Sequence, residues 1–384
     1  MKETGHPSYR ADDALWLFPT VYKYIAETGN TAYLDEEIPF ADKDTGTVRE
    51  HLKRAINFSM THLGLHGMPA GLHADWNDCL VLGPQGVSTF CAFQLYYALN
   101  IMKEFCENEP DYVKYLDQEA EKLLKILNEK CFEGDQYIRG FRDTGDIIGS
   151  KKDKEAATWL NPQSWAVISR AATKEQAEAV LDTACEKLNT PYGLELMQPS
   201  YRYEYFEGAR MRLFNPGTKE NAGIFCQTQG WAILAEALMG HGNRAFQYFA
   251  ESSPASFNDD ADRRVIEPYV HGQFIEGHES PFAGRSHVHW LTGTASTVMV
   301  GCVEGILGLR PTPKGIEISP AIPEEWDGFT MEKVFRGKKL HIIVDNLAHK
   351  QGNPEKYIIN GVEHKPGLIL ESELKDDNVI TVVM

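Results

Sequence analysis

Residues 294–318 read TASTVMVGCVEGILGLRPTPKGIEI, and the character of the chain changes within this stretch. Residues 294–307 are apolar and rich in small side chains, which is typical of a helix that packs closely against another helix. From residue 315 onward the apolar residues come in short β-branched runs separated by turn residues, which is the pattern of strands. Helices and strands in separate blocks of the chain argue against an alternating α/β fold.

The chain before this stretch predicts mostly helices joined by long loops rich in glycine, proline and aromatic residues. Residues 88–106 are apolar enough to predict a buried helix, and Thr173 with Gln176 forms a capping-box signature ahead of another helix. Helical hairpins in series would suit an α/α toroid whose loops at one rim carry a site. The other predicted helices are residues 12–25, 48–63, 112–128, 174–188 and 225–239.

Four short runs after residue 308 predict strands, and together they predict an all-β C-terminal domain over residues 309–384. Asn360 and Gly361 stand at a hairpin position between two of these strands. The turn at residues 336–339, RGKK, is expected to be solvated. The four runs are residues 315–318, 340–344, 356–359 and 379–383.

Length, charge and cysteine usage limit the classes of function. The chain has 384 residues, enough for two domains, and its 42% hydrophobic and 24% charged residues are a globular composition. Its 38 Lys and Arg against 55 Asp and Glu give a net charge of −17, which disfavours binding to nucleic acid or to an anionic membrane. No run of about 18 apolar residues predicts a membrane span. Seven cysteines without a Cys-x-x-Cys pair, and no apolar leader, predict a cytoplasmic protein without disulfides.

The densest polar cluster is residues 73–79, HADWNDC, just before the predicted buried helix. A general acid needs a carboxyl group whose pKa is raised by apolar surroundings. Trp76 beside Asp78 offers such surroundings, together with a flat face for a sugar ring. The alternative is that Asp75 and Asp78 only close turns or cap a helix, and the pattern by itself favours this alternative.

Two further clusters stand at the entries of apolar helices. Residues 217–231 crowd polar side chains before one helix, and residues 290–296 form a small-residue turn before another. Free N–H groups at a helix start favour an anion, and Thr292 with Gly293 adds hydroxyl and close backbone donors, although no Walker motif is present. Ordinary helix capping is the alternative for both clusters.

Two other patterns are weak. His287 and His289 have no third ligand at a recognisable spacing, so no metal site is predicted. Cys79 and Cys226 border two of the polar clusters, but neither has an adjacent histidine to activate it. A thiol nucleophile is therefore not expected.

Taken in order, these clusters resemble the inverting glycoside phosphorylases of the cellobiose phosphorylase family, which includes laminaribiose and chitobiose phosphorylases. The resemblance covers nearly the whole chain, and its specificity comes from several motifs in the correct order. They are residues 12–17 (DDALWL), 74–78 (ADWND), 161–165 (NPQSW), 219–221 (KEN), 229–231 (QGW), 266–269 (IEPY) and 290–295 (WLTGTA).

The resemblance implies a mainly α fold: an (α/α)6-barrel catalytic domain over residues 1–308, incomplete at its N-terminus, and a small β-sandwich-like domain over residues 309–384. It implies inverting phosphorolysis of a β-linked, cellobiose-like glucose disaccharide to α-glucose 1-phosphate and an acceptor sugar. Such an enzyme needs only an acid, because phosphate is already an anionic nucleophile, whereas an inverting hydrolase needs a second carboxylate to activate water. The alternatives are such a hydrolase and an inactive sugar-binding fragment of a phosphorylase.

The resemblance also implies roles for individual residues. Asp78 matches the general acid, and Trp76 matches its neighbour at the donor-sugar subsite. Phosphate is then a co-substrate, no cofactor or metal is implied, and a homodimer is the expected assembly. The other matches are Lys219, Glu220 and Gln273 for sugar contacts, and Thr292, Gly293 and Gln227 for phosphate.

The sequence departs from the family pattern at two places, and it contains an arginine pair that has two possible roles. Gln227 stands where the family has a phosphate-contacting histidine; an amide carries no charge, so phosphate affinity or its pH dependence should differ. The family's upstream Arg/Asp motif has no counterpart before residues 12–17, so a cut inside the catalytic domain is expected. Arg210 and Arg212 would favour an acidic acceptor such as gluconate if they lie near the acceptor subsite, and otherwise are surface arginines. The linkage of the disaccharide stays open.

Overall fold

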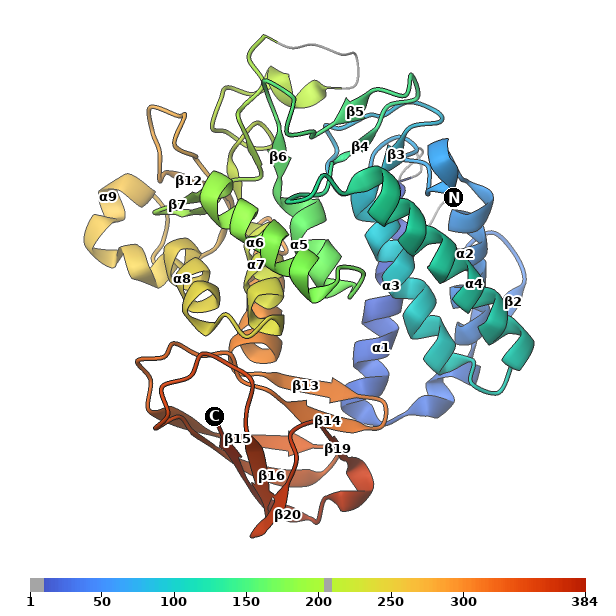
Figure 1. The fold of residues 1–384 in the computed structure, drawn as a ribbon, viewed down its shortest axis with the longest axis vertical. Coiled ribbons are helices and arrows are strands. Elements are labelled where there is room, and N and C mark those ends of the chain that lie inside the picture. The colour runs from blue at the N-terminus through green and yellow to red at the C-terminus, as the bar shows by residue number, and fades with distance from the viewer. Residues whose placement is uncertain (1–9, 204–208) are drawn as a thin grey trace.

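Long helices follow one another through the first part of the chain in the computed structural model, which describes residues 10–203 and 209–384 (Figure 1). Thr47 and Glu50 form a capping box at the start of one helix, and Gly29 in the left-handed conformation ends another. The helices predicted in this part are confirmed. They are α1 (Leu17–Thr28), α2 (Val48–Thr61), α3 (Thr89–Phe105) and α4 (Pro110–Ile126).

The helices continue through the second part of the chain. Thr173 and Gln176 form the predicted capping box, and α7 and α10 begin near the predicted positions. No prediction covers α5 or α8. The elements are α5 (Leu160–Ile168), α6 (Lys174–Leu188), α7 (Cys226–Leu238), α8 (Gly242–Ser252), α9 (Ala261–Arg264) and α10 (Thr294–Val300).

Helix α7 packs directly against α5, α8 and α10. At Gly230 the backbones of α7 and α10 approach so closely that an added Cβ would lie 2.2 Å from the carbonyl carbon of Thr297. Only glycine permits this approach. The predicted close packing of small-residue helices is therefore confirmed.

Four tryptophans meet in the core between these helices. The ring centroid of Trp231 lies 5.4 Å from that of Trp76, 5.7 Å from Trp165 and 5.9 Å from Trp16. Edge-to-face and offset contacts of this kind are favourable beyond the area that they bury. They join α7 to α5, to the segment before α1 and to the loop at residues 73–79, which is thereby attached to the core.

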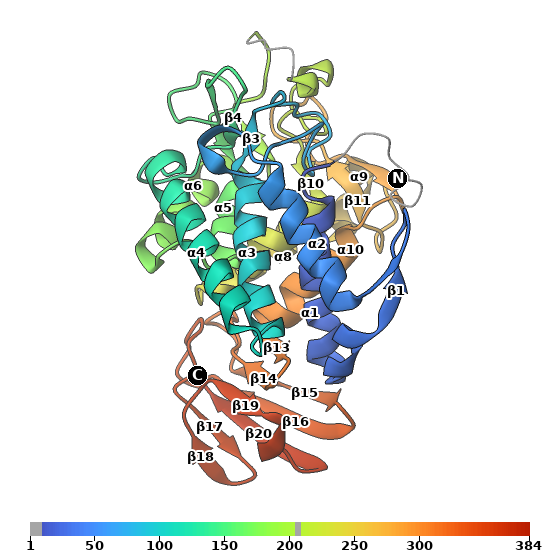
Figure 2. The ribbon, with the colours of Figure 1, turned by 90° about the vertical axis from the view of Figure 1, so that its right-hand side faces the viewer.

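After Gly308 the chain forms two sheets at one end of the helices (Figure 2). The first is three-stranded, with β14 (Gly315–Ile318) between β13 (Leu309–Thr312) and β19 (Leu368–Leu370). The second has five strands, of which β16 and β20 pair in parallel. Its order is β15 (Gly328–Phe335), β16 (Lys338–Asp345), β20 (Asp377–Val383), β17 (Lys356–Ile359) and β18 (Val362–His364).

The four strand predictions are confirmed in β14, β16, β17 and β20. Asn360 and Gly361 form the predicted hairpin turn between β17 and β18, and both have positive φ, 52° and 85°. Buried apolar side chains run without a break from the helices into the sheets, through Ile233, Ile316 and Ile342. The division of the chain at residue 308 stays a prediction.

The turn between β15 and β16 is present, but the prediction that it is solvated is wrong for Arg336. This side chain is only 5% exposed and forms an ion pair with Glu371. Its guanidinium donates to the carbonyl oxygens of Ala26 at 2.6 Å and Thr312 at 2.7 Å. The last carbonyls of a helix lack intrahelical partners, so the end of α1 provides acceptors that hold Arg336.

Short strands form small sheets among the loops of the helical part. In the described ranges no helix is both long and apolar enough to cross a membrane. These strands are β1 (Glu37–Pro39), β2 (Thr45–Thr47), β3 (Val87–Ser88), β4 (Gly140–Phe141), β5 (Ile147–Ile148), β6 (Thr158–Trp159), β7 (Asn189–Thr190), β8 (Gly193–Leu194), β9 (Met197–Gln198), β10 (Ile224–Phe225), β11 (Gly272–Ile275) and β12 (Ser286–His289).

Candidate functional site

The loop at residues 73–79 is held from inside by buried polar side chains. Asp75 accepts hydrogen bonds from the backbone N–H of Asn77 at 2.8 Å and from the Ser88 hydroxyl at 2.6 Å. It also pairs with Arg139 at 2.6 Å, with the two side chains 1% and 0% exposed. Asn77 in turn accepts from the backbone N–H of Cys79 at 3.0 Å. Asp75 therefore closes a turn, which is the alternative role that the sequence allowed for Asp75 and Asp78.

Asp78 lies on the outside of the same loop. Its side chain is 68% exposed and forms an ion pair with Arg10 at 3.0 Å. Trp76 points the other way, with its ring centroid 4.9 Å from that of Phe225 and 5.4 Å from that of Trp231. Asp78 thus lacks the apolar surroundings that the sequence predicts, because the Asp75–Asn77 turn sends the two side chains apart.

The Lys219–Glu220 pair lies beside Asp78. Burial raises the pKa of Glu220, the Asp78 carboxylate raises it further, and the Lys219 ammonium opposes both. The Glu220 atom Oε2 is buried and has no hydrogen-bond partner among the described residues. Arg210 joins this group, since its backbone N–H donates to the Cys79 carbonyl oxygen at 3.0 Å. The structure therefore brings Asp78, Lys219 and Glu220 together.

The cysteines next to these groups are poor nucleophiles. Burial raises the pKa of the Cys79 thiol to about 12, and burial likewise raises that of Cys226 to about 12. A thiol attacks as its thiolate, so both side chains are inert at neutral pH. All seven cysteines of the chain are unpaired.

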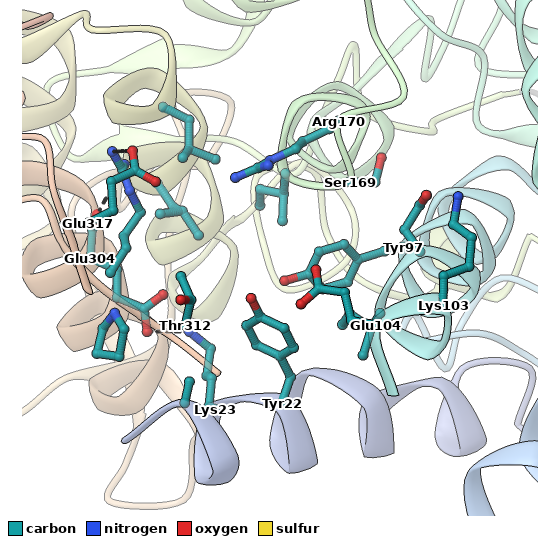
Figure 3. Close-up of a pocket in the computed structure, with 18 of the residues that line it drawn as sticks. Tyr22, Lys23, Tyr97, Lys103, Glu104, Ser169, Arg170, Glu304, Thr312 and Glu317 are labelled. Carbon is teal, nitrogen blue, oxygen red and sulfur yellow. Dashed lines mark hydrogen bonds and ion pairs between the residues drawn. The ribbon is translucent and has the colours of Figure 1, made fainter. Parts of the chain in front are cut away.

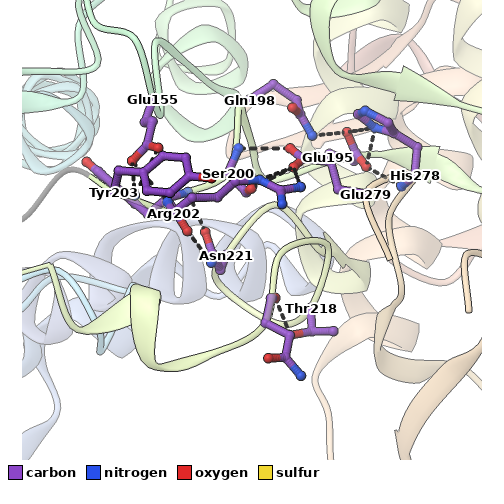
Figure 4. Close-up of polar contacts among 12 residues, drawn as sticks. Glu155, Glu195, Gln198, Ser200, Arg202, Tyr203, Thr218, Asn221, His278 and Glu279 are labelled. Carbon is purple, nitrogen blue, oxygen red and sulfur yellow. Dashed lines mark hydrogen bonds and ion pairs between the residues drawn. The ribbon is translucent and has the colours of Figure 1, made fainter. Parts of the chain in front are cut away.

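Asn221 positions the turn that carries Lys219 and Glu220 (Figure 4). Its fully buried amide accepts from the N–H of Tyr201 at 2.8 Å and donates to the carbonyl oxygens of Tyr201 and Phe214, at 3.0 and 2.9 Å. Glu279 fixes the neighbouring backbone by accepting from the N–H of Ser200 at 2.9 Å. The third residue of the KEN motif is therefore a positioning residue.

The predicted phosphate residues form a second group. The Trp76 indole N–H donates to Gln227 Oε1 at 3.1 Å, which leaves the Gln227 amide nitrogen as a donor. An added Cβ on Gly293 would lie 3.7 Å from that nitrogen, so the turn at residues 292–293 faces it. The Thr292 hydroxyl lies 2.7 Å from the hydroxyl of Thr294. The structure therefore brings Trp76, Gln227 and Gly293 together, with Thr292 adjacent.

Gln273 and the two weakly predicted histidines lie on the neighbouring hairpin. Gln273 is in β11, next to Gly272, whose carbonyl oxygen accepts from the Thr294 hydroxyl at 3.3 Å. His287 pairs with Glu276 at 2.6 Å, and His289 pairs with Glu267 at 3.4 Å, so each histidine faces a carboxylate. No group of three metal-ligating side chains occurs in the ranges that the structure covers.

Asp12 is a buried carboxyl that sequence reasoning did not single out. It is 4% exposed, and it accepts from the Trp16 indole N–H at 2.8 Å. Burial raises its pKa to about 7, and the nearby Asp75 carboxylate adds to the shift. Asp12 stands at a helix start, where an aspartate is usually a cap, yet its side chain makes no capping hydrogen bond.

We expect Asp12→Asn to stabilise the protein above pH 7. The raised pKa means that the folded state holds a proton which the unfolded state has released, so stability falls as the pH rises from about 4 to about 7. A pKa of about 7 against an ordinary value near 4 corresponds to at most about 4 kcal/mol of destabilisation, which the variant would remove. Melting temperatures of the two proteins should coincide near pH 4 and diverge towards pH 8. A constant difference across that range would contradict the assignment.

Comparison with known proteins places these motifs among carbohydrate-active enzymes. Residues 1–308 match the catalytic domain of the glycosyl hydrolase 94 superfamily. N,N'-diacetylchitobiose phosphorylase of Vibrio proteolyticus is 35% identical over an alignment that is 384 residues long. The alignment covers 97% of this chain and 47% of that protein. Solabiose phosphorylase of Paenibacillus borealis is 32% identical, over 93% of this chain and 47% of that protein.

The fold is shared more widely than the sequence. A GH78 rhamnosidase of Bacillus sp. GL1 superposes with a TM-score of 0.55 at 14% identity, over 98% of this chain and 35% of the other. Identity this low shows a shared fold alone. The chain spans about half the length of the phosphorylases that it matches.

Proposed function

The chain belongs to the glycosyl hydrolase 94 superfamily, and on this premise we propose that it carries out inverting phosphorolysis of a β-linked disaccharide. The products would be a sugar 1-phosphate and a free acceptor sugar. We propose further that the helices form part of an (α/α)6 barrel and that residues 309–384 form a domain of their own. Inorganic phosphate as co-substrate, a cytoplasmic location and a homodimer belong to the same proposal.

The orientation of the Gln227 amide carries the proposal. The Trp76 indole holds Gln227 Oε1, so the amide N–H groups point to the turn at residues 292–293. Amide N–H groups and threonine hydroxyls are donors that a phosphate accepts without needing a formal positive charge. Trp76, which orients this donor, is two positions from Asp78, so one loop carries both the proposed acid and the side chain that orients the phosphate donor.

In this proposal Asp78 and phosphate act on opposite faces of the sugar. Asp78 gives its proton to the glycosidic oxygen as the bond from that oxygen to the anomeric carbon breaks. A phosphate oxygen forms the new bond to the anomeric carbon from the opposite face, which inverts its configuration. The free Oε2 of Glu220 and the Lys219 ammonium offer an acceptor and donors for sugar hydroxyls.

A single assay separates this proposal from its alternatives. Cellobiose, laminaribiose and chitobiose, and a gluconate-containing disaccharide because of Arg210, would be incubated with and without phosphate. Sugar 1-phosphate formed only with phosphate supports the proposal. Release of free sugar alone, independent of phosphate, would indicate a hydrolase, and binding without turnover would indicate a sugar-binding fragment.

Gln227→His should make phosphate use depend on pH. Imidazole gains a proton near pH 6.5, and the cation would then form a charge-assisted hydrogen bond to phosphate. We expect the KM for phosphate, relative to that of the unaltered protein, to fall several-fold between pH 8 and pH 6. Gln227→Leu is the matched control and should raise that KM at every pH. Unchanged values in both variants would place the phosphate elsewhere.

A further inference from the structure

A cavity of about 480 Å³ lies at the other end of the helices from the candidate site (Figure 3). The candidate site stands where α3 and α7 begin, whereas the cavity is lined by the last turns of the same helices, including Asn100 and Leu238. Helix α1 and the end of α5 form further walls, and β13 and β14 close the base. The two sites are therefore separate.

Two charged groups face this cavity without a partner. The side chains of Glu104 and Arg170 form no hydrogen bond or ion pair within residues 10–203 and 209–384, although Lys314 and Arg170 act on Glu104 electrostatically. Burial raises the pKa of Glu104. Other charged groups of the wall are paired, as Arg310 is with Glu317 at 3.0 Å. The unpaired carboxylate and guanidinium are thus available to a ligand.

Two tyrosines add neutral hydrogen-bonding groups beside this pair. Figure 3 shows the hydroxyls of Tyr22 and Tyr97 and the Glu104 carboxylate directed to the middle of the cavity, with Arg170 reaching in from the end of α5. Burial raises the pKa of Tyr97 to about 12, and that of Tyr22 still further. Both phenols therefore stay protonated and can donate as well as accept.

We propose that this cavity binds a neutral mono- or disaccharide. A sugar hydroxyl can donate to Glu104 while another accepts from Arg170, and the tyrosines supply both ring surface and hydroxyls. The charged side chains of the wall are four cations and four anions, so the cavity favours no net charge. Its volume lies in the range of about 300–1,000 Å³ that small-ligand sites occupy.

Isoleucine methyl NMR on the full chain locates the sugar directly. Ile101 and Ile168 line the cavity, whereas Ile224 and Ile275 lie in the strands next to the candidate site. Glucose or cellobiose, titrated to about 100 mM to reach weak millimolar binding, should shift the first pair of methyl signals. Because each pair reports on its own site, this result does not depend on the proposed phosphorolysis.

Variants of Glu104 and Arg170 test whether these two side chains bind the sugar. Glu104→Gln and Arg170→Gln should each weaken the sugar affinity seen at Ile101 by several-fold to about tenfold, because a hydrogen bond to a neutral amide is about half as strong as one to a charged group. Glu121→Gln, an exposed carboxylate on α4, should leave it unchanged. Ile101 and Ile168 signals that do not move with sugar, a sugar affinity in both variants that equals that of the unaltered protein, or binding of free glycine in place of sugars would each overturn the proposal. Unchanged melting temperatures show that the variants remain folded.

Discussion

An Asp78→Asn variant is expected to lose phosphorolysis by about 10²- to 10⁴-fold, the usual contribution of a general acid. Asparagine has nearly the same shape but cannot give a proton to the glycosidic oxygen. Stability should change little, because the Asp78 side chain is 68% exposed and solvent screens its ion pair with Arg10. The loss would therefore report on chemistry and not on folding.

The leaving group provides a sharper test of the same role. A 4-nitrophenyl β-glycoside needs little protonation to depart, so Asp78→Asn should lose much less activity on it than on a disaccharide. Asp35→Asn removes an equally exposed, ion-paired carboxylate and should leave both activities intact. Equal losses on the two substrates would show that Asp78 is not the acid, and Glu220 would be the next candidate.

Asp75→Ala is expected to destabilise the protein by about 3–5 kcal/mol, the cost of breaking a buried ion pair. The substitution leaves the Arg139 guanidinium, which is 0% exposed, without its carboxylate. Among the described residues, the Ser88 hydroxyl at 2.9 Å is then the only hydrogen-bond acceptor left to this guanidinium. The turn that carries Trp76 and Asp78 would loosen as well.

Denaturant unfolding of the full chain measures this effect. The midpoint should fall markedly for Asp75→Ala but stay unchanged for Asp35→Ala, which removes an exposed partner of Arg49. Replacing both partners by apolar residues, as in Asp75→Leu with Arg139→Met, should cost less than Asp75→Ala alone. A double variant at least as unstable as Asp75→Ala would contradict the assignment of this cost to the unpaired guanidinium.

The sequence predicted the long helices because their apolar positions recur with a helical period. It failed at α5, where all nine residues are buried and no polar face marks the period. Helix α8 begins at Gly242 followed by Asn243, a pair that signals a turn. The two-residue strands β3 to β5 are too short to give any pattern.

The candidate site was predictable in its members but not in its geometry. Local motifs identified Trp76 and Gln227, yet the two residues are 151 positions apart in the chain, and no local pattern encodes the hydrogen bond between them. The sequence did not predict the buried position of Arg139, because a single arginine next to a two-residue strand belongs to no periodic pattern. The exposure of Asp78 depends on the Asp75–Asn77 turn, which no period encodes.

Arg336 makes the hairpin of β15 and β16 a remote cap for α1, whose acceptor Ala26 is 310 residues away along the chain. Opening the sheet would remove the donor from the Ala26 carbonyl near the end of α1, and fraying α1 would take that acceptor away from a buried guanidinium. The two elements should therefore open together, as one cooperative unit. Ala26 and Thr312, which accept from Arg336, also line the cavity, so a sugar bound there would strengthen this coupling between the two ends of the chain.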